Sequence, residues 1–359
     1  MEGEIMNDEH QQWTGEEQLI RLLRASYQRH PGQLNEPFAA DAELIDLSGE
    51  LNLAWTVDCL REEIELGILE NPALIGWTSV AISLSDLAAV AADPVGLLLA
   101  WTIPPKFSSD LLSKISRGAQ DAAAFHKTYL MGGDCNTGSP LQISSTALGT
   151  VPKHITLQRV GMLPGDGLFL TGPIGAGNAL GFAKLRKLPE ASALEDSYRP
   201  VARFDWGHVL REFATSSIDT SDGVLASLDI LARLNNCGIE FRNRPSFYAG
   251  SVRMMAFRYN IPLWLFAAAE HGEFELLFSV RAEREGEFLD RCTQAHLACS
   301  RIGTVLKERE FRIETSGSVA NIDIRRVRGL AENLSNDPGG YVTSLIEYSS
   351  SVGIKEDKP

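Results

Sequence analysis

The sequence predicts a protein of the α+β class with two domains, and three observations lead to this prediction. At 359 residues the chain is long for a single domain. Each half mixes strand-like runs, helical stripes and hairpin-like junctions, which favours α+β over a purely parallel wound sheet. Between residues 151 and 166, two prolines and two glycine turns interrupt any regular period and indicate a boundary.

These observations divide the chain into four parts. We expect a flexible tail over 1–15, an N-terminal domain over 16–152, a C-terminal α/β domain over 153–348 and a flexible tail over 349–359.

The N-terminal half begins with a capping box, Thr14-x-x-Glu17, followed by a helical stripe of apolar residues that ends near Arg29. The elements expected after it, in order, are a strand at 51–58, a helix at 73–92, a strand at 95–103, a helix at 109–126, a strand at 128–131 that enters a GGD turn, and a strand at 141–151.

The sequence of the C-terminal half predicts a further series of helices and strands. Helices are expected at 175–188, 201–214, 223–235 and 282–295, and strands at 167–172, 215–219, 238–242, 273–281, 301–306, 310–314 and 321–326.

Composition excludes several classes of function. The net charge of −14, from 47 acidic and 33 basic residues, argues against a nucleic-acid surface, which needs clustered Lys and Arg. The most apolar stretch, 79–105, is broken by Asp86, Asp93 and Pro94 and should not span a membrane. The five cysteines form no CxxC pair, so neither a zinc site nor a disulfide framework is indicated. The expected location is the cytoplasm.

Six aspartates stand at the ends of apolar, strand-like runs or in tight turns beside them, namely Asp41, Asp58, Asp86, Asp134, Asp219 and Asp222. A carboxylate at the end of a buried strand is costly unless a cation neutralises it. Oxygen-only ligands favour Mg²⁺ over zinc, and Mg²⁺ commonly arrives with phosphates. The aspartates therefore predict an enzyme that uses a Mg²⁺-nucleotide.

Two of the glycine-containing segments suit such a site. In 132–138 (GGDCNTG), Gly133 lets the backbone approach a ligand closely, although an ordinary turn explains the segment equally well. In 218–223 (IDTSDG), a helix start beside two carboxylates can hold phosphate through its amides, and Ser221 or Asp222 can also simply cap the helix. Arg159 fits two interpretations: it binds a phosphate group of the ligand, or it is an ordinary solvent-exposed arginine.

The order of these pieces resembles the thiamine-monophosphate kinase family. AAD, TVD, SDLAA, GGD, R-x-G-x-x-P-G-D-G-L-F-L-T-G, ID-x-SDG and FELLF follow one another through about 16–345. The family lies within the superfamily of aminoimidazole ribonucleotide synthetase and selenophosphate synthetase. The resemblance implies an ATP-dependent enzyme with two α/β halves, whose N-terminal domain binds ATP and Mg²⁺ and pairs with a second copy to form a dimeric β-barrel.

The resemblance also implies roles for individual residues. The residues that match metal ligands are Asp41, Thr56, Asp58, Asp86, Asp134, Asp219 and Asp222; those that match nucleotide contacts are Thr56, Gly133, Asp134, Arg159 and Ser221. Asp134, Arg159 and Asp222 are the expected catalytic residues, with Arg159 offsetting charge on the γ-phosphate.

The chain departs from the family mainly in residues expected to contact the substrate. Ala40 replaces one carboxylate of the GDD motif, Glu65 stands where the family has a histidine, and Gly272 stands where it has a glutamate. Glu270 and Glu273 lie next to Gly272 and are candidate replacements. Tyr341 matches the aromatic residue that covers the thiamine rings.

The resulting hypothesis is a Mg²⁺- and ATP-dependent phosphotransferase that phosphorylates a small anionic metabolite and acts as a homodimer. Two alternatives stay open: an ATP-dependent ligase or cyclase that proceeds through a phosphorylated intermediate, and a protein that binds ATP without turnover. A product scan separates the first two, since a diphosphate indicates a kinase and inorganic phosphate with a C–N bond indicates a ligase.

Overall fold

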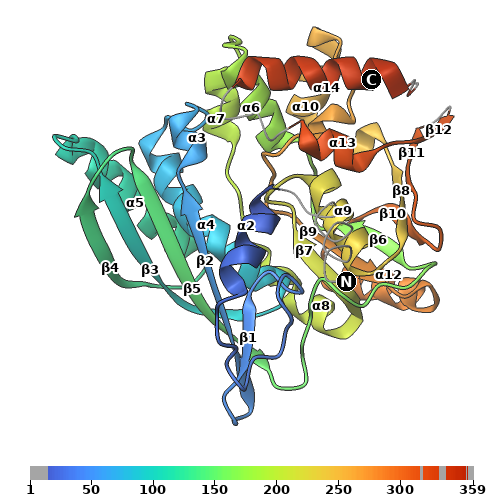
Figure 1. The fold of residues 1–359 in the computed structure, drawn as a ribbon, viewed down its shortest axis with the longest axis horizontal. Helices are drawn as coiled ribbons and strands as arrows, with labels where there is room; N and C mark the ends of the chain where they lie inside the picture. The colour runs from blue at the N-terminus through green and yellow to red at the C-terminus, as the bar shows by residue number, and fades with distance from the viewer. Residues whose placement is uncertain (1–14, 316–317, 331–336, 353, 355–359) are drawn as a thin grey trace, which may run out of the picture.

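The computed structural model describes residues 15–315, 318–330, 337–352 and 354, and it has a mixed α+β architecture with two sheets (Figure 1). One sheet has five strands from the N-terminal half, and the other has seven strands from the C-terminal half. The predicted fold class is therefore confirmed, and the described residues form no closed barrel within one chain. The capping box at Thr14 and the first tail through residue 14 lie outside the described residues.

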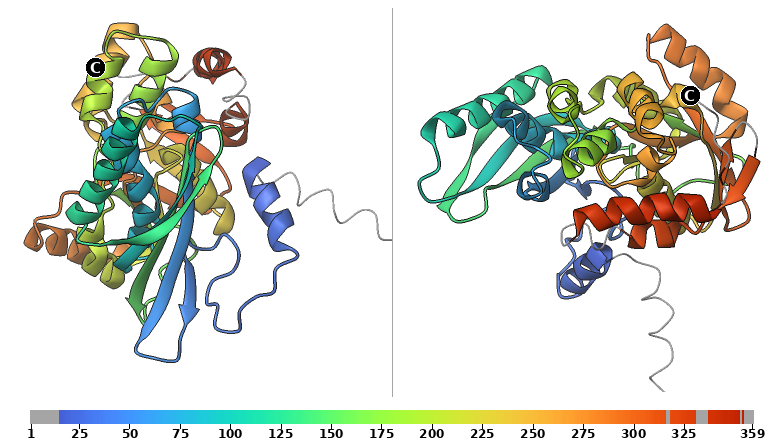
Figure 2. Two further views of the ribbon diagram at one scale, coloured as in Figure 1. Left: turned by 90° about the vertical axis from the view of Figure 1, so that its left-hand side faces the viewer. Right: turned by 90° about the horizontal axis from the view of Figure 1, so that it is seen from above.

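The five-stranded sheet has the order β1-β2-β5-β3-β4. Its strands are β1 (Glu43–Asp46), β2 (Leu51–Leu60), β3 (Asp93–Ile103), β4 (Leu130–Thr137) and β5 (Gln142–Pro152). All neighbours are antiparallel except β3 and β4. Helices α4 (Pro72–Ala89) and α5 (Ser109–Phe125) cover one face (Figure 2). Trp55, Val57 and Leu98 are exposed.

Helix α4 is the central core helix of this half. The side chain of Asn71 accepts hydrogen bonds from the amides of Ala73 and Leu74, and Pro72 occupies the first turn, as expected for a helix start. By length and composition α4 could cross a membrane, but 78% of its apolar window is buried in the fold. Gly76 lies against the backbone of Ile115 in α5, so the two helices cross closely.

The seven-stranded sheet has the order β12-β11-β8-β10-β6-β9-β7. Its strands are β6 (Gly167–Leu170), β7 (Ala214–Asp219), β8 (Gly238–Arg242), β9 (Leu276–Val280), β10 (Ser300–Leu306), β11 (Phe311–Thr315) and β12 (Ser318–Asn321).

The remaining helices pack around these sheets, with α2 beside β1 and α14 across the C-terminal half (Figure 1). They are α2 (Gly15–Arg24), α3 (Glu62–Glu65), α6 (Ala176–Leu185), α7 (Ala191–Ser197), α8 (Gly207–Phe213), α9 (Val224–Leu234), α10 (Gly250–Tyr259), α11 (Leu265–Ala268), α12 (Glu285–Gln294), α13 (Ile324–Gly329) and α14 (Pro338–Val352).

The hydrophobic cores cross the expected boundary between 152 and 153. One core joins Ile143 of β5 with Leu168 and Leu170 of β6, and the other joins Val151 with Phe169. The boundary therefore separates the two sheets in sequence, while burial of apolar surface holds the halves together.

Several sequence expectations are corrected. GGD is not a turn, because β4 continues through it in parallel with β3. The helix expected at 201–214 is confined to Gly207–Phe213 after a short 3-10 turn. The strand expected at 321–326 is replaced by the end of β12 and by α13, where the side chain of Asp323 accepts a hydrogen bond from the Arg326 amide. The tail expected from 349 is helical as far as Val352.

Candidate active site

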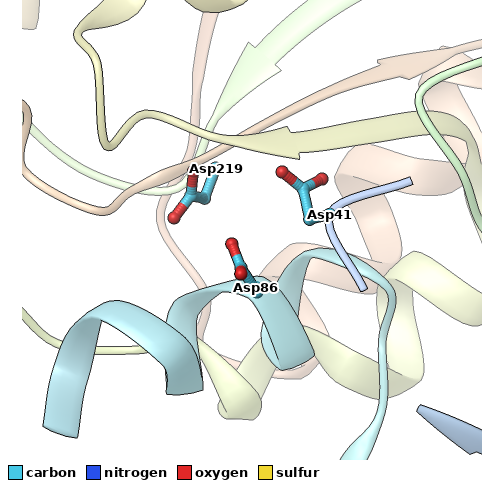
Figure 3. Close-up of side chains that lie close together, drawn as sticks. All are labelled: Asp41, Asp86 and Asp219. Carbon is cyan, nitrogen blue, oxygen red and sulfur yellow. The ribbon is translucent and has the colours of Figure 1, made fainter. Parts of the chain in front are cut away.

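Three of the predicted aspartates form a cluster of carboxylates between the two sheets. Asp41 precedes β1, Asp86 lies on α4 and Asp219 ends β7, and one carboxylate oxygen of each lies within 4.8 Å of the others (Figure 3). Residues separated by almost 180 positions thus present oxygen ligands to one point, as a hard cation requires. We call Asp41, Asp86 and Asp219 the carboxylate cluster.

Strand β2 adds two further predicted residues to this site. The hydroxyl of Thr56 donates to Oδ2 of Asp86 at 2.5 Å. Asp58 is two residues along the strand, so its side chain points to the same face. Thr56, Asp58, Asp86 and Asp222 all line one cleft of about 840 Å³, into which Ser221 also projects.

Arg159 places a positive charge next to the carboxylate cluster. Its guanidinium donates to Oδ1 of Asp41 at 2.6 Å from Nη2 and 3.3 Å from Nε. Its backbone amide donates to the carbonyl of Ala39 at 2.7 Å, which fixes the loop before β1. Arg159 is thus oriented toward Asp41, and its expected contact with a γ-phosphate stays a prediction.

Burial dominates the electrostatics of the cluster. Desolvation raises the pKa of Asp41, Asp58 and Asp86, and the neighbouring carboxylates raise that of Asp86 further. Burial, and then the charge of Asp41, raise the pKa of Asp219 to about 7. Asp41, Asp58, Asp86 and Asp219 bring four carboxyls together, and Arg159 pairs only with Asp41 among them, so the site favours an added positive charge.

The donor set fits Mg²⁺. Asp41, Asp58 and Asp219 each have a buried Oδ2 without a hydrogen-bond partner among the described residues. Carboxylate oxygens and a threonine hydroxyl are hard ligands, which Mg²⁺ prefers and Zn²⁺ does not.

The IDTSDG segment forms the edge of the cleft at the start of α9. The hydroxyl of Ser221 donates to Oδ1 of Asp219 at 2.8 Å, and the hydroxyl of Ser227 donates to the Asp219 carbonyl at 2.9 Å. Gly223 has a φ of +84°, and a Cβ there would meet the Ala269 carbonyl at 2.3 Å. Glycine is therefore needed to bring Asp222 and Ser221 to the cleft.

Asp134 and Gly133 lie elsewhere. Strand β4 is the outer edge of the sheet, separated from β2 by β5 and β3. The exposed carboxylate of Asp134 accepts a hydrogen bond from Asn136 at 2.8 Å. Gly133 packs against the backbone of Leu99, so its missing side chain serves the contact between β3 and β4. Within one chain, neither residue joins the carboxylate cluster.

The predicted substrate residues are also dispersed. Glu65 is exposed and pairs with Arg61 at 2.8 Å, four residues earlier. Glu273 is buried and accepts from the amide of Gly175 at 2.6 Å, so it caps the start of α6; burial raises its pKa to about 8. Glu270 is half-buried, and Tyr341 is a buried residue of α14.

A small cavity behind Ser221 contains residues that the sequence did not single out. It is lined by Glu63, Thr78, Tyr198 and His271, among others. Glu63 was within reach of sequence reasoning, because it lies two residues before Glu65 in the same EEIE segment. Thr78 stands among apolar and small residues, so the sequence pattern does not mark it. His271 lies between Glu270 and Gly272, so its neighbours among the substrate candidates are the signal that could have found it.

Comparison with protein families and curated relatives gives the following similarities. Residues 39–151 match the family model "AIR synthase related protein, N-terminal domain". The thiamine-monophosphate kinase of Escherichia coli (strain K12) is 34% identical over 205 residues, which cover 55% of this chain and 62% of that enzyme. The chain therefore spans less than two thirds of that relative. The enzyme of Buchnera aphidicola subsp. Schizaphis graminum is 26% identical, with 80% and 90% covered.

Solved structures show the same fold. The structure "AaThiL complexed with AMPPCP and TMP" has a TM-score of 0.70 at 22% identity and covers 84% of this chain and 95% of its own. Thiamine-monophosphate kinase from Stenotrophomonas maltophilia K279a has a TM-score of 0.66 at 26% identity, with 82% and 95% covered. The HypE-HypF complex contains a chain with a TM-score of 0.64 at 18% identity, with 85% and 98% covered.

Proposed function

We propose that the chain, which is similar to thiamine-monophosphate kinases and matches the AIR synthase family model over residues 39–151, is a Mg²⁺-dependent kinase that transfers the γ-phosphoryl group of ATP to thiamine monophosphate. The observation that carries the proposal is the carboxylate cluster, whose oxygens lie within 4.8 Å of one another at the edge of a cleft of about 840 Å³. That arrangement suits a metal-bound triphosphate, which is long and highly charged.

Asp41, Asp58, Asp86 and Asp219 would hold the metal, with Asp222 at the same edge of the cleft. When bound, Mg²⁺ neutralises charge on the phosphate oxygens. Thr56 orients the carboxylate of Asp86 through the hydrogen bond from its hydroxyl. Arg159 opposes the effect of burial by lowering the pKa of Asp41, and its two nitrogens hold the carboxylate in place.

The chemistry needs little acid–base help. A phosphate oxygen of the acceptor forms a bond to the γ-phosphorus of ATP while the bond from that phosphorus to the β–γ bridging oxygen breaks, and ADP leaves. An acceptor phosphate is already anionic at neutral pH, so no proton must be removed from the attacking atom. The chain contributes position and charge, through the carboxylates and the amides at the start of α9.

We propose that the active form is a homodimer in which Asp134 serves the cleft of the partner. Trp55 and Val57 of β2 are 49% and 65% exposed and also line the cleft, so an apolar sheet face borders the nucleotide site. In a two-fold dimer the same faces meet, and edge strand β4 can then reach the opposite cleft. This would reconcile the expected metal role of Asp134 with its position on β4.

We also propose a cytoplasmic location, which suits the five free cysteines.

The test is an assay of product formation. The purified chain is incubated with thiamine monophosphate, ATP and Mg²⁺, and nucleotides, thiamine phosphates and inorganic phosphate are separated. We expect thiamine diphosphate and ADP in equal amounts, and neither product when EDTA replaces Mg²⁺. Inorganic phosphate without thiamine diphosphate would contradict the kinase proposal.

A further inference from the structure

A second, smaller cavity lies behind the edge of the cleft. Ser221 lines both, so this inner cavity adjoins the nucleotide site. Its volume is about 30 Å³. Its walls include the apolar side chains of Ile68, Leu69 and Leu180. A space of this size accommodates about two water molecules or the polar edge of a ligand, but not a whole ring.

Two residues that line the inner cavity each have a buried polar atom without a hydrogen-bond partner among the described residues. These atoms are Oγ1 of Thr78, whose residue is only 3% exposed, and Nε2 of His271. Burial lowers the pKa of His271 to about 4, so its imidazole is neutral at pH 7 and can donate or accept one hydrogen bond there. Buried polar atoms are normally paired, so both are candidates to pair with a ligand.

The backbone that carries His271 is held firmly. Its amide donates to Oδ1 of Asn178 at 2.7 Å. The Tyr198 hydroxyl donates to the Gly272 carbonyl at 2.7 Å, and the Gly272 amide donates to the Ser221 carbonyl at 2.8 Å. The imidazole rests on α6, where a Cβ added at Gly181 would come within 2.7 Å of Cδ2. The position of the ring is therefore set by the fold and does not depend on a ligand.

On its other side the imidazole borders a separate apolar cavity of about 40 Å³, lined by Phe182, Phe266 and Tyr341 among others. His271 thus stands between a polar cavity next to the nucleotide site and an apolar cavity beneath α14. Its ring is a wall of both cavities, and Nε2 is one of the two unpaired polar atoms named above.

We propose that His271 is a specificity-determining residue of the acceptor site, where Nε2 of His271 and the hydroxyl of Thr78 bind the polar edge of a nitrogen heterocycle on the acceptor. The inference rests on the proposed function, because it assigns the inner cavity to the phosphoryl acceptor. The carboxyl of Glu63, which lines the same cavity and whose pKa burial raises, provides a third polar group for an amino substituent.

The two unpaired groups, the Thr78 hydroxyl and the His271 imidazole, define the class of acceptor. A hydroxyl and a neutral imidazole recognise hydrogen-bonding nitrogen atoms and provide no countercharge for a second phosphate. The acceptor is therefore a phosphomonoester with a heteroaromatic ring, whose phosphate lies toward Ser221 and whose ring edge faces His271. An aminopyrimidine fits this description.

The experiment measures binding, so it does not depend on turnover. Calorimetry gives the Kd of thiamine monophosphate, and of the phosphate ester of its thiazole half alone, for protein saturated with Mg²⁺ and a non-hydrolysable ATP analogue. His271→Ala should weaken binding of thiamine monophosphate about five- to tenfold, and His271→Asn should restore part of the loss. Neither change should alter the Kd of the thiazole ester or of the ATP analogue.

Two further variants separate recognition from folding. Thr78→Val should also weaken thiamine monophosphate binding while raising the Tm of the free protein by about 1–2 °C, because it removes an unpaired buried hydroxyl. His208→Ala changes an exposed histidine on α8 and should change neither quantity.

Equal loss of affinity for both esters, or no binding of thiamine monophosphate by the native chain, would overturn the inference. Binding that depends on His271 but leads to no phosphoryl transfer would contradict the proposed kinase activity and leave this subsite in place.

Discussion

The two ends of the proposed active site differ in the polar atoms they leave unpaired. At the carboxylate cluster these atoms are carboxylate oxygens, contributed by Asp41 and Asp219. In the residues around the inner cavity they are the hydroxyl of Thr78 and a neutral imidazole nitrogen of His271. The first set demands a cation, whereas the second can only satisfy hydrogen bonds. One end therefore has the chemistry for charge neutralisation and the other has the chemistry for recognition.

The largest effect on catalysis is expected at the carboxylate cluster. Asp86→Asn should lower kcat about 1000-fold, because it removes a ligand that supplies several kcal/mol of charge stabilisation. Without Mg²⁺ the variant should be at least as stable as the native chain, since burial and neighbouring carboxylates already disfavour an ionised Asp86. Steady-state kinetics and thermal unfolding with and without Mg²⁺ measure both.

Asp121→Asn, on the exposed face of α5, is the matched control and should leave kcat and the Mg²⁺-dependent Tm unchanged. Near-native turnover by Asp86→Asn would remove the carboxylate cluster from the mechanism.

The second prediction tests whether one chain supplies all the metal-binding carboxylates, or whether Asp134 comes from the partner. Asp86→Asn and Asp134→Asn should each be inactive as homodimers. A heterodimer of the two, isolated through different affinity tags, should recover about half of native activity, because one of its two clefts contains both native aspartates. Failure to recover activity would show that Asp134 does not act in the partner's cleft.

A smaller effect, on stability and acceptor binding, is expected from backbone crowding at Gly272 in the wall of the inner cavity. A Cβ at Gly272 would lie 1.5 Å from the carbonyl oxygen of Thr220, so Gly272→Ala must displace one of the two segments. We expect a loss of about 1–3 kcal/mol in the free energy of unfolding and weaker acceptor binding, with the Mg²⁺ dependence retained. Urea unfolding and acceptor KM are the measurements.

Gly207→Ala provides the comparison for this change, because nothing lies within 4 Å of an added Cβ at the start of α8. It should be neutral or stabilise by up to about 1 kcal/mol. Equal effects of the two substitutions would mean that crowding at Gly272 is not significant.

The smallest effect is expected at Glu65. Its exposed pair with Arg61 is of the i,i+4 type, so Glu65→Gln should cost at most about 0.5 kcal/mol and leave acceptor KM unchanged. Glu63→Gln, two residues away at the inner cavity, should raise acceptor KM. The reverse result would return the substrate role to Glu65 and weaken the assignment of the inner cavity.

The difference between the two ends also explains which site residues the sequence could predict. Asp41, Asp58, Asp86 and Asp219 interrupt apolar runs, and such carboxylates are costly unless they serve a common cation. Thr78 and His271 carry no comparable cost, because a threonine on a buried helix and a neutral histidine in a loop are common in protein cores. Their importance comes from lacking partners, which only the packing reveals.

By itself, the sequence determined the α+β class, most strands and helices of the N-terminal half, and the carboxylates that converge, because hydrophobic periodicity and costly buried charges are visible along the chain. It placed GGD in a turn, whereas pairing with β3 makes it strand β4. Tertiary structure alone decided that Asp134 lies on an outer edge strand, that Arg159 pairs with Asp41, and that His271 separates two cavities. These outcomes depend on which distant segments pack together, and local pattern contains no information about that.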